Sequence, residues 1–156
     1  MLAGLLFWLI ALPVWAEDCS GALELSGDWG WARFDVELAL DPESRARGLM
    51  HREALGARQG MLFVYPRPGH PAFWMKNTLI ALDMLFIGKD GVIRRIKHRA
   101  QPGDLTPVDG GPGVLAVLEI RGGLAATLGV APGDRVQHPA FTPAGALSAD
   151  WPCEVK

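Results

Sequence analysis

Glycine and proline punctuate this chain at short intervals, and the apolar segments between them are correspondingly short. Six to eight of these segments have the length and pattern of β-strands, and only one or two have those of a helix. Helices of about two turns cannot build an all-α core. The sequence therefore predicts a mainly β protein, a single compact antiparallel β-sandwich or barrel with one or two short helices.

The clearest predicted strand runs from Trp29 to Leu40, where apolar and polar residues alternate as in a half-buried strand. Residues 81–87 and 114–120 are nearly all apolar, which predicts strands buried on both faces. Asp41 and Pro42 are typical of the N-cap and first residue of a short helix. The other predicted elements are strands at 60–65, 73–76, 92–99 and 135–138, a helical turn at 123–128 and a long loop at 101–113.

The size and charge of the chain limit what it does. It has 156 residues, of which 49% are hydrophobic and 21% charged, with a formal net charge of −2. This composition suits one globular domain. The nearly neutral balance argues against a strongly basic nucleic-acid-binding protein, so we expect no nucleic-acid partner.

The first 16 residues are typical of a signal peptide. They contain no charged side chain, and the apolar run that begins at Leu2 is too short to span a membrane. Val14 and Ala16 suit a cleavage site, which predicts cleavage after Ala16, a periplasmic or secreted protein, and no stable membrane span afterwards. An uncleaved apolar anchor is the alternative. The predicted divisions are a signal peptide (1–16), an N-terminal arm (17–33), a β-rich domain (34–138) and a C-terminal tail (139–156).

Export favours a disulfide between the only two cysteines, Cys19 and Cys153. They lie near the two ends of the predicted mature chain, and the termini of compact domains often lie close together. A catalytic or metal-binding thiol pair is the alternative, and it requires both tails to reach one site.

Four motifs lie in the middle of the chain: RGLMHR (47–52), GMLFVY (60–65), FWMKNT (73–78) and LDMLFI (82–87). Together with Glu119 and Gly122, they resemble domain-of-unknown-function family 192 over residues 34–138. This resemblance implies a compact β-rich domain. It implies no reaction, so the residues themselves must indicate the function.

Trp74, Lys76 and Asn77 alternate with apolar Phe73 and Met75. An indole beside an ammonium and an amide can hold a sugar or a peptide backbone. The alternative is structural: Lys76 covers Trp74 with its aliphatic stem, and Asn77 stabilises a turn.

Asp83 and Glu119 each lie in a predicted buried strand, where a carboxylate must be paired, hydrogen-bonded or protonated. Arg47, Arg52 and Lys76 are the nearest cations in the sequence. For Asp83 we expect Lys76, Arg52 or several backbone N–H groups as partners. A structural ion network and an acid–base or binding site are both open.

Two further clusters have alternative interpretations. Four methionines (Met50, Met61, Met75, Met84) and two histidines (His51, His70) would suit copper(I), or the methionines simply fill the core. The basic residues between 94 and 99 protect an edge strand or bind an anionic ligand or lipid headgroup.

No nucleophile, phosphate-loop or zinc motif is present in the sequence, so we predict no catalytic residue, no metal and no cofactor. The function predicted is a non-catalytic binding or accessory module of the cell envelope, with a small ligand or an envelope protein as partner. The candidate binding residues are Arg47, Arg52, Trp74, Lys76, Asn77, Asp83 and Glu119. A small acid–base enzyme that uses Asp83 or Glu119, and a copper-handling protein, are the alternatives.

Overall fold

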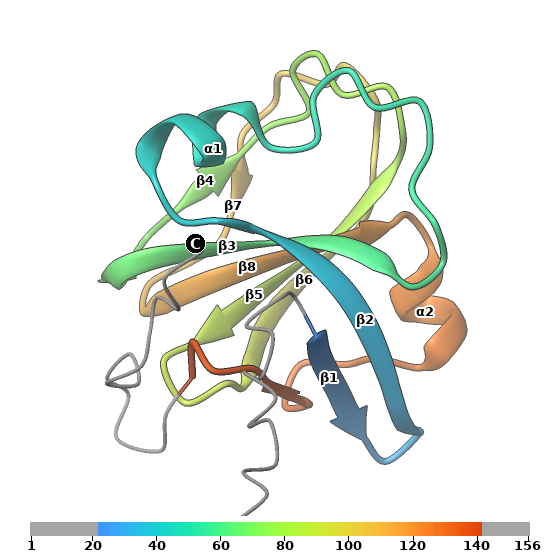
Figure 1. Cartoon of the computed structure of the whole chain (residues 1–156), viewed down its shortest axis with the longest axis vertical. Helices are drawn as coiled ribbons and strands as arrows, with labels where there is room; N and C mark the ends of the chain where they lie inside the picture. The colour runs from blue at the N-terminus through green and yellow to red at the C-terminus, as the bar shows by residue number, and fades with distance from the viewer. Residues whose placement is uncertain (1–21, 142–156) are drawn as a thin grey trace, which may run out of the picture.

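The computed structural model describes residues 22–141, which are mainly β with two short helices, as predicted (Figure 1). Seven strands form one sheet in the order β6-β5-β8-β3-β2-β1-β9, and β4 pairs with β7 in a separate two-stranded sheet. The strands are β1 (Ala22–Gly27), β2 (Gly30–Ala39), β3 (Gln59–Gly69), β4 (Ala72–Phe73), β5 (Leu82–Gly88), β6 (Ile93–Ala100), β7 (Val108–Asp109), β8 (Val114–Arg121) and β9 (Arg135–Gln137). The helices are α1 (Pro42–Arg47) and α2 (Leu124–Leu128).

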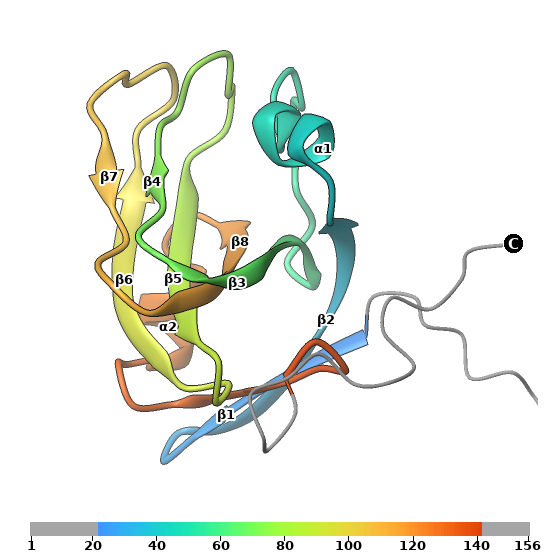
Figure 2. The same ribbon diagram turned by 90° about the vertical axis from the view of Figure 1, so that its left-hand side faces the viewer.

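The large sheet curls into a half-barrel whose two ends approach each other (Figures 1 and 2). Val92, beside β6, forms a single bridge with Arg135 of β9. The amide of Val136 donates to the carbonyl of Gly91 at 2.8 Å. Together with two more backbone hydrogen bonds, between Ile93 and residues 133–134, this short contact joins the two ends without a long ladder. A mainly β fold is confirmed, and a closed sandwich or barrel is not.

One pair of strands differs from the predicted antiparallel arrangement. β2 and β3 run parallel, and all the other pairs of the large sheet are antiparallel. A parallel pair requires a crossover connection, and the segment that contains α1 makes it. α1 begins as predicted, because the amide of Ser44 donates to Oδ1 of Asp41 at 2.9 Å and Pro42 is the first helical residue.

Both faces of the sheet are covered. The interior of the half-barrel carries an apolar row across five strands, formed by Leu38, Leu62, Leu118, Leu85 and Ile96. The outer face is covered by a second cluster, in which Phe73 of β4 packs edge-on against Phe63 and Phe86. The residues of β5 are therefore buried throughout, as predicted for a strand covered on both sides.

Three local features differ from the sequence prediction. Residues 22–33, placed in an N-terminal arm, form β1 and the first part of β2. The strand predicted at 73–76 ends at Phe73, and the long loop contains β7, which pairs with β4. The predicted signal peptide, Cys19 and Cys153 lie outside the described residues. Neither helix within residues 22–141 has the length and hydrophobicity needed to cross a bilayer.

The carboxylate of Asp83 joins three segments of the fold. Its side chain is fully buried. Oδ1 accepts the amide N–H of Arg99 at 2.7 Å and that of Gly123 at 2.9 Å, and Oδ2 accepts the N–H of Ala125 at 2.8 Å. The prediction of several backbone N–H groups is thus confirmed, whereas the predicted cations Lys76 and Arg52 lie elsewhere.

Each of these N–H groups needs an acceptor from outside its own element. Leu82 pairs with Ala100 and Met84 with Lys97, so β6 has a bulge opposite Asp83, and Arg99 has a left-handed φ of 46° within it. At α2 the N-cap is Gly123, which has no side chain to accept hydrogen bonds. Asp83 therefore supplies the cap that α2 lacks and the acceptor that the bulge requires.

We predict that Asp83→Ala lowers the free energy of unfolding by about 3–5 kcal/mol, because it leaves two buried N–H groups and one partly buried N–H group without an acceptor. Denaturant unfolding measures the change. Asp35→Ala is the control, since Asp35 is an exposed aspartate of β2 and its loss should cost less than about 0.5 kcal/mol. Equal stability of the two variants would contradict this role of Asp83.

Candidate functional site

Three loops lie together at the end of the sheet where β5 begins, and we call residues 48–58, 74–81 and 101–107 the loop face (Figure 1). The amide of His51 donates to the carbonyl of Asn77 at 2.9 Å. The amide of Met75 donates to the carbonyl of Asp104 at 2.8 Å. Backbone hydrogen bonds thus fix the RGLMHR and FWMKNT segments against each other and against the third loop.

His51 and Asn77 both have left-handed backbone conformations, with φ of 63° and 53°. This conformation is unfavourable for residues other than glycine, by on the order of 1 kcal/mol. The two strained residues are the ones joined by the backbone hydrogen bond, and Nδ2 of Asn77 also lies 4.0 Å from Sδ of Met50. Strain held in place at an exposed loop is a feature that clusters at binding sites.

Trp74 and Lys76 are exposed beside this joint. Nζ of Lys76 lies 5.1 Å from the centroid of the Trp74 ring, which is half exposed. Met75 between them is buried in the outer cluster. Exposed and buried side chains therefore alternate from Trp74 to Lys76 as predicted, although β4 already ends at Phe73. Leu79 and Leu105 on the same face are 55% and 60% exposed, an unusual exposure for leucine.

Glu119 lies in the outer face of the sheet, on the same side as the apolar residues that the loop face covers. It pairs with Met61 of β3 and Met84 of β5, which belong to the outer cluster together with Leu49 and Met75. Its side chain is 4% exposed and forms no hydrogen bond or ion pair with any residue between 22 and 141. Burial raises the pKa of Glu119 to about 8, so the carboxyl group is mostly protonated at neutral pH.

Comparisons with known proteins identify the family. The model of domain-of-unknown-function family 192 (DUF192), described as an uncharacterized ACR, matches residues 23–138. The chain belongs to this family. No curated protein matches the sequence.

Two solved structures are similar to this DUF192 chain, each with a TM-score of 0.73. A protein of unknown function from Novosphingobium aromaticivorans DSM 12444 is 44% identical, and the match covers 74% of this chain and 83% of that one. A protein from Sinorhizobium meliloti 1021, described as a "putative transcription regulator", is 41% identical, with 74% and 91% covered. The suspected family and its β-rich fold are both confirmed.

The candidate residues of this DUF192 domain fall into separate places. Trp74, Lys76 and Asn77 lie together on the loop face. Arg52 forms an ion pair with Glu37 of β2, and Arg47 is exposed at the end of α1. Neither arginine contacts Asp83.

Asp83 and Glu119 point to opposite faces of the sheet. On neighbouring strands, Asp83 pairs with Ile120 and Met84 pairs with Glu119, and side chains of paired residues share a face. Asp83 thus points into the half-barrel, and Glu119 points outward. The two carboxyl groups do not form a joint acid–base pair, and all three N–H partners of Asp83 belong to the backbone.

The methionines and histidines do not converge on one site. Met61, Met75 and Met84 are buried in the outer cluster, where they fill the core. His51 lies on the loop face, whereas His70 pairs with Asp109. Within residues 22–141, no group of three His, Cys, Asp or Glu side chains is placed to hold a metal ion.

Sequence reasoning missed three residues of the loop face. His51 was considered only as a copper ligand, and its left-handed conformation was not predicted although His, like Asn and Asp, is enriched in that conformation. Leu105 did leave a signal, since it is a large apolar residue in the Gly/Pro-rich segment 101–113, whereas Leu79 adjoins apolar Ile80 and Ala81 and gave none.

We predict that Glu119→Gln removes a pH dependence of stability. Between the ordinary pKa near 4.5 and the folded value of about 8, the unfolded chain has released the proton that the folded protein keeps. Folding stability therefore falls by about 1.4 kcal/mol per pH unit as pH rises through this window, and glutamine has no such loss. Denaturant unfolding is measured at pH 5, 6.5 and 8. The free energy of unfolding of Glu119→Gln should rise relative to that of wild type as the pH rises.

The control for this measurement is Glu53→Gln, which removes an exposed carboxylate of the loop face. Its difference from wild type should stay nearly constant with pH, because water solvates both forms of that group. A Glu119→Gln variant whose stability runs parallel to that of wild type would show that the carboxyl group is not buried as described.

Proposed function

We propose that this protein is an exported, non-catalytic binding module of the cell envelope that binds its partner with the loop face. The observation that carries this proposal is the joint between His51 and Asn77, two strained residues that hold the exposed pair of Trp74 and Lys76 in a fixed position. Strained residues of this kind cluster at binding sites, which supports the assignment of a binding role to the joint.

The composition of the loop face favours an envelope protein as the partner. Trp74, Leu79 and Leu105 supply exposed apolar surface, and Lys76 and Asn77 supply polar groups beside it. Binding interfaces commonly combine apolar anchors, tryptophan above all, with a polar rim. A small ligand that stacks on Trp74, such as a saccharide, is the other outcome of the test.

Glu119 supports a second candidate function, that of a small acid–base enzyme. A buried carboxyl group with a pKa of about 8 can donate a proton near neutral pH. A reaction would require Glu119 to work without Asp83, because the two groups lie on opposite faces. For this reason we favour the binding function over the enzyme. A reaction product formed by wild type but not by Glu119→Gln would instead favour the enzyme.

We predict that Trp74→Ala weakens partner binding about 30-fold, the usual effect of truncating a tryptophan at the centre of an interface. The immobilised protein is exposed to envelope extract from its native host, the bound component is identified by mass spectrometry, and its Kd is then measured. Trp31→Ala is the matched control, because Trp31 is 71% exposed but lies in the β1–β2 hairpin. An equal loss in both variants, or none in Trp74→Ala, would contradict the proposal.

We also predict that the protein isolated from its native host begins at Glu17 and is found in the periplasmic or extracellular fraction. Its intact mass decides the first point, and a mass that includes residues 1–16 would indicate an uncleaved anchor. The same spectrum, recorded before and after reduction, tests the Cys19–Cys153 bridge, which lowers the mass by two hydrogens. A mass unchanged by reduction would exclude that bridge.

A further inference from the structure

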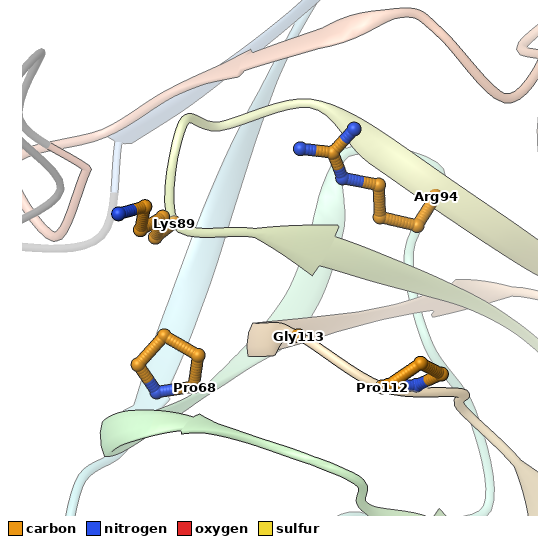
Figure 3. Close-up of a pocket in the computed structure, with 5 residues that line it drawn as sticks. All are labelled: Pro68, Lys89, Arg94, Pro112 and Gly113. Atoms are coloured by element: carbon orange, nitrogen blue, oxygen red, sulfur yellow. The ribbon is translucent and has the colours of Figure 1, made fainter.

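An open pocket of about 430 Å³ lies at the other end of β5, away from the loop face. It is lined by Pro68, Lys89, Arg94, Pro112 and Gly113, and Figure 3 shows the two cationic side chains on one side of it and the prolines on the other. The volume falls within the range of small-molecule sites. None of these residues belongs to the candidate site described above.

The sheet is irregular around this pocket. Phe86 pairs with Arg95 and Ile87 with Ile93, so Arg94 is the extra residue of a bulge in β6. The register of β8 shifts between Val114 and Ala116, against both β5 and β3. Bulges redirect side chains and occur often beside active and binding sites. Here they occur in all the strand pairs that meet at the pocket.

The bulge places the guanidinium of Arg94 over the backbone of Gly88. A Cβ atom at Gly88 would lie 2.7 Å from Nε of Arg94, so a larger residue there would displace the guanidinium. Nη2 of Arg94 donates to Oδ2 of Asp90 at 2.6 Å, and Oδ1 of Asp90 accepts the amide of Val92 at 3.2 Å. The hairpin thus holds the guanidinium in place and leaves its other N–H groups for a ligand.

Lys89 adds a second positive charge to the pocket. Among residues 22–141, no carboxylate forms an ion pair with Lys89. Pro68 and Pro112 offer no backbone N–H groups, so the two cations are the charged donors among the residues that line the pocket. The ammonium of Lys89 is therefore the positive charge of this pocket that has no carboxylate partner among the described residues, whereas Arg94 is already paired with Asp90.

We propose that this pocket binds a phosphate group. A phosphate monoester carries a charge of about −1.5 to −2 at neutral pH, and Lys89 and Arg94, the latter also paired with Asp90, are the cations that line the pocket. The planar guanidinium can donate two parallel hydrogen bonds to its oxygens, and lysine is a common second donor. The group belongs either to a small soluble phosphate or to a lipid headgroup at the envelope surface, which present the same chemistry.

The test is a nuclear magnetic resonance titration of the ¹⁵N-labelled protein with inorganic phosphate, against sodium chloride at equal ionic strength. We expect saturable shifts at Lys89, Arg94 and Gly113 that chloride does not produce. Arg94→Gln should weaken binding about tenfold or more. Arg95→Gln is the matched control, because it removes the same charge from the next residue of β6, outside the pocket, and should change binding less than about twofold.

A second variant tests the same geometry in the opposite direction. Asp90→Asn keeps the acceptor for Val92 but removes the carboxylate that neutralises Arg94, so phosphate should bind about threefold more tightly. Sedimentation with phosphatidylglycerol vesicles, compared with phosphatidylcholine vesicles, separates the two sources. Saturable shifts with free phosphate support a soluble ligand, and Arg94-dependent sedimentation without such shifts supports a headgroup. If neither occurs, or if Arg95→Gln acts like Arg94→Gln, the proposal is wrong.

Discussion

The carboxylate of Asp83 is the constraint on which the rest of this structure depends. It is buried in the half-barrel and accepts N–H groups from the bulge of β6 and from the start of α2. A charge without those three donors would be too costly to bury, and the donors without the charge would be unsatisfied. The interaction therefore forms as a unit, and it fixes the edge strand and the helix relative to β5.

Because Asp83 fixes one end of β5, the loop face is attached to a rigid base. β5 begins directly after the loop that carries Trp74 and Asn77. Both faces of the central strands are filled with apolar side chains, which leaves no room for a site in the middle of the sheet. The exposed side chains that could bind a ligand lie at the ends of the strands, where the regular pairing stops and loops or turns begin.

Local patterns in the sequence predicted most of the fold but not its pairing. The alternation in β2 and the apolar runs of β5 and β8 follow directly from how many faces each strand buries. The parallel pairing of β2 with β3 has no local signature, because it depends on a crossover. Asp83 and Glu119 were recognisable as carboxyl groups in apolar runs. That they point to opposite faces follows from the register between β5 and β8, which the sequence does not reveal. Nor does the sequence reveal which backbone N–H groups bind Asp83, because every residue except proline has one.

The basic run of β6 shows why two interpretations of one motif can both hold. β6 is an edge strand, and exposed charges along an edge oppose unwanted strand pairing. An edge strand also has a neighbour on only one side, so it accommodates an extra residue with the disturbance of one ladder rather than two. β6 does so twice, opposite Asp83 and at Arg94. The first bulge serves the fold, because Asp83 accepts its free N–H. The second has no such acceptor from the core, and it directs its cation toward the pocket instead.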